Sequence, residues 1–214
     1  MNGKTGPDPA LRPGSGVSRR DSGAGERLAV AVTHPSASPD SAGAAIEAHR
    51  QAWYEDFCAR AKGTNVNDRT LLATDYLNHF NEIIMLMELV PDAPECLEDC
   101  CAWEPKSYVQ HFQDSHIADR DLAIAAYAYS PPEFRTTFDY VVAEMNRLVA
   151  TALPAIEAAT QKGDAERCRH IVEMSVAGLR ALVDRASAAI HGNVHAMDQG
   201  EIDRLMELST ASWA

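Results

Sequence analysis

Two histidine–carboxylate pairs are the residues whose types and spacing could support chemistry. His79 and Glu82 stand three positions apart, and His170 and Glu173 repeat that spacing later in the chain. Side chains three or four positions apart project from the same side of a helix, so each pair could present an imidazole and a carboxylate to one ion. Asp75, four residues before His79, would extend the first pair. Because helical bundles hold iron or manganese with such ligands, the five residues predict a metal site with a redox or oxygen-handling role.

This metal site depends on which helices pack together. Di-iron carboxylate bundles carry the order Glu-x-x-His, whereas the histidine comes first in both pairs here. A site forms if the helix carrying His79 lies beside the helix carrying His170 and brings the two imidazoles within bridging distance. If the two histidines lie on separate surfaces, each is a helix-flank residue hydrogen-bonded to a carboxylate or to water. The sequence leaves both interpretations open.

Other chemical motifs are missing from the sequence. It contains no G-x-S-x-G, no phosphate-binding glycine loop and no dinucleotide fingerprint, so no catalytic motif is found and the sequence leaves open whether the chain is an enzyme. Cys96, Cys100 and Cys101 form C-x3-C-C, which lacks the second ligand pair of a structural zinc site. We interpret these cysteines as a reduced, half-buried cluster under a loop.

Composition limits the class of protein and the kinds of partner. The chain has 214 residues, 46% of them hydrophobic, which is enough for one domain with a real core. Its formal net charge of −12 argues against nucleic acid and anionic membrane surfaces, because both are recognised by basic surfaces. No run is long enough for a membrane span and no signal peptide is recognisable, so we expect a cytoplasmic protein.

Hydrophobic periodicity predicts an all-α fold, a bundle of four or more helices with a disordered N-terminal tail. Residues 1–42 are rich in Pro and Gly and form the tail, residues 43–192 form the helical bundle domain, and residues 193–214 form a C-terminal amphipathic helix and tail. The helices are expected over residues 44–62, 68–90, 108–113, 119–129, 131 to about 162, 165–190, and from 198 onward. We expect the first two to form an antiparallel hairpin.

Local signals mark the ends of the longest helices. Ser130 is expected to cap the helix that begins with Pro131, with Glu133 closing a capping box. Gly163 should end that helix and Asp164 should cap the next one. Both helices carry a seam with a regular spacing of three and four residues, composed of Phe134, Phe138, Val141, Met145, Leu148, Ala152 and Ala155 in the first and of Ile171, Met174, Gly178, Leu182, Ala186 and Ala189 in the second.

The segment from Met197 to Met206 offers a second indication of function. It resembles the short response-regulator-binding peptide at the start of the flagellar motor switch protein, and a similar acidic and apolar helix ends the chemotaxis response-regulator phosphatase. The resemblance covers about ten residues and implies a capped amphipathic helix that docks into a protein groove. The residues that would make this contact are Glu201, Ile202, Asp203, Leu205 and Met206.

The sequence therefore supports two functional hypotheses. The leading one is a cytoplasmic binding or regulatory protein that acts through protein–protein contacts, with a partner of the response-regulator type. The alternative is the metal-binding bundle described above, with iron or manganese as its cofactor. A homo-oligomer is compatible with either hypothesis.

Overall fold

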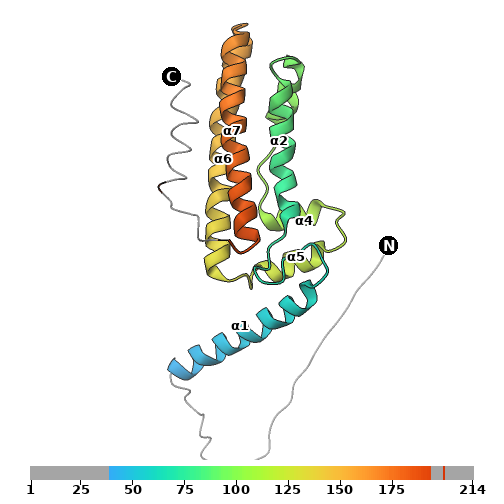
Figure 1. Ribbon diagram of the computed structural model, residues 1–214, viewed down its shortest axis with the longest axis vertical. Helices are drawn as coiled ribbons and strands as arrows, with labels where there is room; N and C mark the ends of the chain where they lie inside the picture. The colour runs from blue at the N-terminus through green and yellow to red at the C-terminus, as the bar shows by residue number, and fades with distance from the viewer. Residues whose placement is uncertain (1–38, 194–199, 201–214) are drawn as a thin grey trace, which may run out of the picture. The chain divides into compact units, whose positions relative to one another are not determined.

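A computed structural model describes residues 39–193 and Gly200. This part of the chain is helical and contains no β-strand, so the predicted all-α class is confirmed; one isolated bridge joins Val66 and Ala73. None of the described helices combines the length and apolar character needed to cross a membrane. The elements, shown in Figure 1, are α1 (Pro39–Ala61), the 3-10 helix η1 (Thr74–Leu77), α2 (Asn78–Leu89), the 3-10 helix η2 (Pro94–Cys96), α3 (Leu97–Ala102), α4 (Tyr108–Asp114), α5 (Arg120–Tyr127), α6 (Pro132–Gln161) and α7 (Ala165–Ile190).

The centre of the fold is a hairpin of the two longest helices, α6 and α7, with α2 packed against α7 (Figure 1). Gly163 turns the chain with φ of +68°, a conformation that costs glycine little, and Asp164 accepts a hydrogen bond from the backbone N–H of Arg167 at 3.0 Å. Both signals were predicted from the sequence and are confirmed. Helix α6 continues through Pro154 to Gln161.

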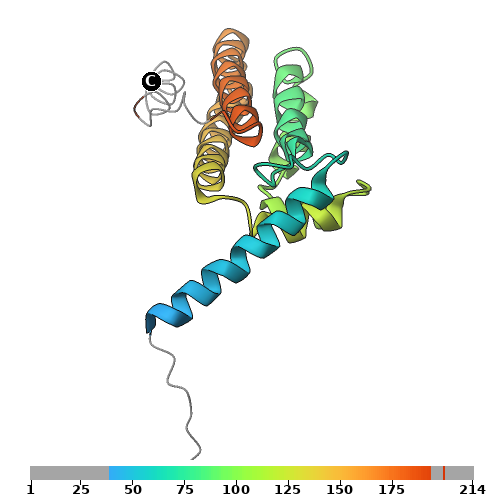
Figure 2. The same cartoon turned by 60° about the horizontal axis from the view of Figure 1, so that its bottom comes forward.

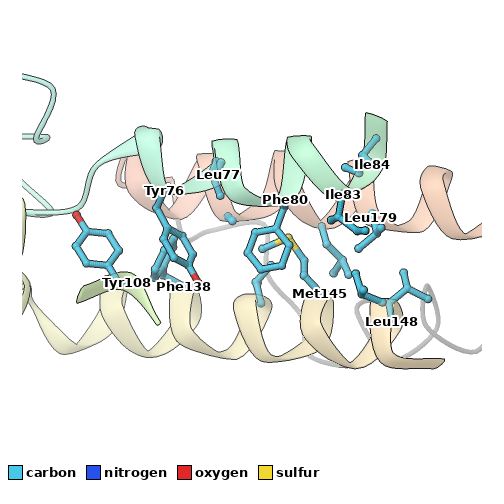
Figure 3. Packing of buried hydrophobic residues seen from close by; sticks show 14 of the residues in the cluster. Tyr76, Leu77, Phe80, Ile83, Ile84, Tyr108, Phe138, Met145, Leu148 and Leu179 are labelled. Carbon is cyan, nitrogen blue, oxygen red and sulfur yellow. The ribbon is translucent and has the colours of Figure 1, made fainter. Parts of the chain in front are cut away.

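The predicted seams of α6 and α7 make up much of the core. Side chains of α6, α7 and the η1–α2 segment interdigitate along the bundle, as Figure 3 shows for Phe80, Met145 and Leu148. Nearly all the seam residues are buried: Phe134, Phe138, Val141, Met145, Leu148 and Ala152 of α6, and Ile171, Gly178, Leu182, Ala186 and Ala189 of α7. Ala155 and Met174 are half-buried.

The predicted helix over residues 68–90 is wrong in its first half. The Asn67 side chain accepts hydrogen bonds from the backbone N–H groups of Arg69 and Thr70, which offers the backbone an alternative to helix. Leu71 follows with φ of +59°, and the Thr70 hydroxyl donates to the carbonyl of Ile190 at 2.6 Å. The α-helix therefore starts at Asn78, after the 3-10 turn η1.

Helix α1 also departs from the sequence prediction. It begins at Pro39, inside the segment 1–42 assigned to the tail; residues 1–38 lie outside the described residues. Instead of forming a hairpin with α2, α1 makes its main helix contact with α5. On α1, Phe57 is buried, whereas Ile46 and Trp53 are exposed. Figure 2 shows α1 as one uninterrupted helix.

The start of α6 differs in detail from the predicted capping box. Pro131 occupies the N-cap position and Pro132 the first helical position, with no side-chain capping bond. Ser130 is fully buried, and its Oγ has no hydrogen-bond partner among the residues that the structure describes. Two consecutive prolines, which lack N–H groups and have a fixed φ, begin this helix without the cap that Ser130 was expected to supply.

Candidate functional site

His79, the centre of the sequence-predicted metal stripe, is buried and holds a loop in place. Its ring stacks on Trp103 with centroids 4.5 Å apart, and its Nε2 accepts a hydrogen bond from the backbone N–H of Lys106 at 3.2 Å. The Trp103 indole N–H donates to the carbonyl oxygen of His79, also at 3.2 Å. His79 thus acts as an anchor for residues 103–107, the segment between α3 and α4.

Two tyrosines link this loop and the start of α4 to the segment around η1. The Tyr76 hydroxyl donates to the carbonyl of Lys106 at 2.8 Å, and the Tyr108 hydroxyl accepts from the backbone N–H of Ala73 at 2.9 Å. The ring centroids of the two tyrosines lie 5.4 Å apart. Because Tyr76 is on η1 and Tyr108 opens α4, these bonds join segments about 30 residues apart in the chain.

The anchoring role requires a neutral imidazole at position 79. Burial lowers the pKa of His79 to about 4, and the neighbouring charges of His111 and Lys106 act in the same direction, while the carbonyl of Glu104 opposes them. Burial also lowers the pKa of His111. At neutral pH His79 is therefore uncharged, and its Nε2 is free to accept the Lys106 N–H.

The other members of the predicted stripe face different surroundings. Glu82, one turn after His79, is exposed. Asp75 is half-buried on η1, and its Oδ2 has no hydrogen-bond partner within residues 39–193. His170 and Glu173 are both exposed on α7. The first half of the predicted site thus combines buried and exposed side chains, and the second half lies in solvent.

The packing of α2 on α7 also keeps the two halves apart. The helices run antiparallel, because Thr70 bonds to Ile190 at one end while Asp92 pairs with Arg169 at 2.8 Å at the other. His170 follows Arg169, and at about 1.5 Å of rise per residue it lies roughly 15–20 Å from the level of His79. No three His, Cys, Asp or Glu side chains within residues 39–193 are placed to hold a metal ion. The five predicted ligands are therefore not assembled.

The cysteine cluster has no metal geometry either. Cys100 is buried, Cys101 is exposed and Cys96 is half-buried. Burial raises the pKa of Cys100 to about 11, with the neighbouring cysteines adding to the effect. The Cys100 thiol therefore stays protonated at neutral pH and packs as a small apolar group, as expected for a structural cysteine.

The loop held by His79 forms one wall of a surface pocket of about 350 Å³. Residues from four elements meet there: Tyr76 from η1, Tyr108 from α4, Tyr127 from α5, and Asp139 and Asn146 from α6. Figure 3 shows Tyr76 and Tyr108 grouped with Phe138 at one end of the core. The pocket thus lies where the aromatic end of the bundle core reaches the surface.

Aromatic rings and one carboxylate define the chemistry of this pocket. The rings of Tyr108 and Tyr127 stack with centroids 4.5 Å apart and planes inclined by 13°. The Tyr127 hydroxyl donates to Oδ1 of Asp139 at 2.5 Å. Partial burial among these groups raises the pKa of Asp139, although the bond from Tyr127 and the charge of Arg135 oppose that effect. Two stacked rings and one hydrogen-bonded carboxylate therefore lie side by side in the lining of this pocket.

Sequence reasoning did not identify this pocket. Its residues come from segments between 76 and 146, and no spacing rule connects them. The one available signal was the frequency of tyrosine in this region, with Tyr108, Tyr127, Tyr129 and Tyr140 within 33 residues.

Large apolar side chains are also exposed on α1 and, separately, on α2. Ile46 is 70% exposed and Trp53 40% on α1, and Met85 is 64% exposed and Leu89 52% on α2. Met85 and Leu89 are four residues apart, so they share one helix face. Large apolar side chains grouped on a surface commonly mark contacts with other proteins.

The predicted partner-binding residues Glu201, Ile202, Asp203, Leu205 and Met206 lie outside the described residues. Gly200, just before them, is helical and exposed. Comparisons with protein-family models, with curated proteins and with solved structures found no significant match to this chain.

Proposed function

We propose that this protein is a cytoplasmic, protein-binding helical bundle that regulates a response-regulator-type partner through its C-terminal segment. The observation that carries the proposal is the residue pattern of that segment, in which Glu201, Ile202 and Asp203 are followed by Leu205 and Met206. Leu205 and Met206 stand three and four positions after Ile202, so a helix presents the three apolar side chains on one face. The two carboxylates would meet basic groups at the edge of the partner's groove.

The helical bundle supports the proposal because it places a folded helix, α7, shortly before the C-terminal segment and offers further contact surface. Helix α7 ends at Ile190, with Gly192 at φ of +80°, so seven residues separate it from Asp198 at the start of the pattern. Apolar side chains that are exposed on α1 and α2, such as Trp53 and Met85, offer additional area to a protein partner. Within residues 39–193, no group of side chains is placed to favour the metal-binding alternative.

Removing residues 198–214 is expected to abolish binding of the partner while leaving the bundle folded. The buried residues of the described part lie within 57–190, so the truncated chain should keep its helical circular dichroism and cooperative unfolding. The measurement is biolayer interferometry of the full and truncated chains against purified receiver domains from the same genome, with and without beryllofluoride activation. We expect at least one domain to bind the full chain with a Kd of about 1–100 μM, since a short docked helix buries a small area.

Three results would contradict the proposal. Binding to none of the receiver domains would rule out a response-regulator partner. Equal binding of the full and truncated chains would place the contact elsewhere. Loss of helical structure on truncation would show that residues 198–214 belong to the core of the bundle.

A further inference from the structure

We infer that the pocket between α5, α6 and the loop at residues 105–107 binds a small organic ammonium ion, with the Asp139 carboxylate as its counter-ion. Four observations lead to this ligand class: the hydroxyl hydrogens of Tyr76, Tyr127 and Ser107 are already engaged, the one lining cation is paired, a buried acceptor has no partner among the described residues, and aromatic rings form much of the wall. This site is independent of the protein contact proposed above.

Three hydroxyl groups of the lining already donate their hydrogen to a protein acceptor. The Tyr76 hydroxyl donates its hydrogen to the carbonyl of Lys106, and the Tyr127 hydroxyl donates to Asp139. The Ser107 hydroxyl bonds to Oε1 of Gln110 and is engaged in the capping box of α4. Because each hydroxyl has one hydrogen to give, the remaining capacity of these groups is for a ligand that donates hydrogen bonds or carries positive charge.

The net charge of the pocket is set by Asp139. Lys106 also lines the pocket, but its ammonium group pairs with Asp114 at 2.7 Å. Arg135 stands 6.0 Å from the centre of the Tyr127 ring, donates to the carbonyl of Ala128 and is not part of the lining. The charge of Arg135 also acts on Asp139, but the Asp139 carboxylate lines the pocket and is accessible to a cation that enters. The net charge of −12 on the chain favours the approach of cations.

Asn146 supplies an unsatisfied acceptor in the same wall. Its Oδ1 is buried and has no hydrogen-bond partner within the described structure. An unpaired buried acceptor is unfavourable, and a donor on a bound ligand would satisfy it. Asn146 lies seven residues after Asp139, two turns along α6, so both groups project from the same side of that helix.

The aromatic rings and the size of the pocket favour the same class of ligand. Tyr76, Tyr108, Tyr127 and Phe138 line it, and aromatic ring faces attract ammonium groups through their quadrupoles. A volume of about 350 Å³ is at the lower end for ligand pockets and suits a compact molecule. A methylated or primary alkylammonium ion fits these requirements better than a large cofactor.

Three isosteric probes test the charge preference directly. Choline is the cation, 3,3-dimethylbutan-1-ol is its neutral counterpart, and 3,3-dimethylbutanoate is the anion. Each is titrated into the full ¹⁵N-labelled chain while the amide shifts of Val142 and Ala143, which line the pocket, are followed by NMR. We expect choline to bind with a roughly millimolar Kd, given its few heavy atoms. The neutral probe is expected to bind about tenfold more weakly, and the anion more weakly still.

Substitutions locate the binding in the pocket. Asp139→Asn keeps an acceptor for the Tyr127 hydroxyl but removes the charge, and it should weaken choline binding about tenfold. Asp121→Asn on α5 is the matched control, since that carboxylate is 92% exposed and outside the pocket. The Asp121→Asn chain should bind choline with the same affinity as the wild type. Any one of four outcomes would overturn the inference. They are equal binding of choline and its neutral counterpart, tighter binding of the anion, unchanged choline binding by an Asp139→Asn chain with wild-type helical content, and no amide shift at about 50 mM choline.

Discussion

Replacing Phe138 with alanine is expected to lower the free energy of unfolding by about 3–5 kcal/mol. Phe138 is 1% exposed, and its ring centre lies 5.5 Å from that of Tyr76 and 5.8 Å from that of Tyr108. The substitution removes a large ring where η1, α4 and α6 meet, and these anchored segments cannot easily collapse into the cavity. Urea or guanidinium unfolding of both proteins gives the difference directly.

A surface substitution provides the comparison for this result. Met85→Ala also removes a large apolar side chain, but Met85 is 64% exposed, so its effect should stay within about 0.5 kcal/mol. If Phe138→Ala lost less than about 1 kcal/mol, the aromatic end of the bundle would not belong to the cooperative core. The pocket would then lack the rigid wall that its proposed ligand requires.

The second large effect concerns pH and His79. Its pKa is about 4 in the folded protein, below the ordinary value of about 6.5 expected on unfolding. Between these values the unfolded chain binds more protons, so the stability from His79 is fully present above about pH 6.5 and is lost as the pH falls towards 4. We expect this residue to account for about 2–3 kcal/mol of stability lost between pH 7.5 and 4.5.

Substitution separates this contribution from those of other acid-sensitive groups. His79→Gln retains an amide oxygen able to accept the Lys106 N–H but has no titrating ring, so the variant should lose about 2–3 kcal/mol less than the wild type over that range. His111 faces His79 at 5.9 Å between ring centres and remains in both proteins, as do Lys106 and Glu104. His170→Gln is the control for replacing a histidine, because that side chain is exposed on α7 and makes none of the contacts that hold the loop. Parallel stability curves for the wild type and His79→Gln would contradict the anchoring role.

The elements that sequence reasoning predicted well are those governed by local rules. The turn at Gly163, the cap at Asp164 and the seams through Leu148 and Leu182 depend on residues within one or two helix turns of each other. Hydrophobic period and backbone preference decide such features. The first half of the predicted helix over residues 68–90 was wrong because the side chain of Asn67 accepts hydrogen bonds from nearby backbone N–H groups. Hydrophobic periodicity does not reveal such a local alternative to the helix.

The candidate site depends instead on contacts between distant segments. The sequence pattern nominated His79 as a metal ligand, but its partners Trp103 and Lys106 lie 24 and 27 residues away, and they give it a structural role. The bond between Tyr127 and Asp139 likewise follows from the way α5 meets α6. A spacing pattern along one helix can therefore nominate a residue, whereas the packing of the helices decides what that residue does.

A calorimetric titration of the receiver domain that binds the full chain tests directly whether the C-terminal segment makes the contact. Ile202→Asp places a charge on the apolar face of the C-terminal segment, and Ser212→Asp adds the same charge beyond the pattern. The proposal predicts that Ile202→Asp weakens binding at least about tenfold, whereas Ser212→Asp binds as the wild type does. Equal affinities of wild type, Ile202→Asp and Ser212→Asp would contradict a role for this segment in partner binding.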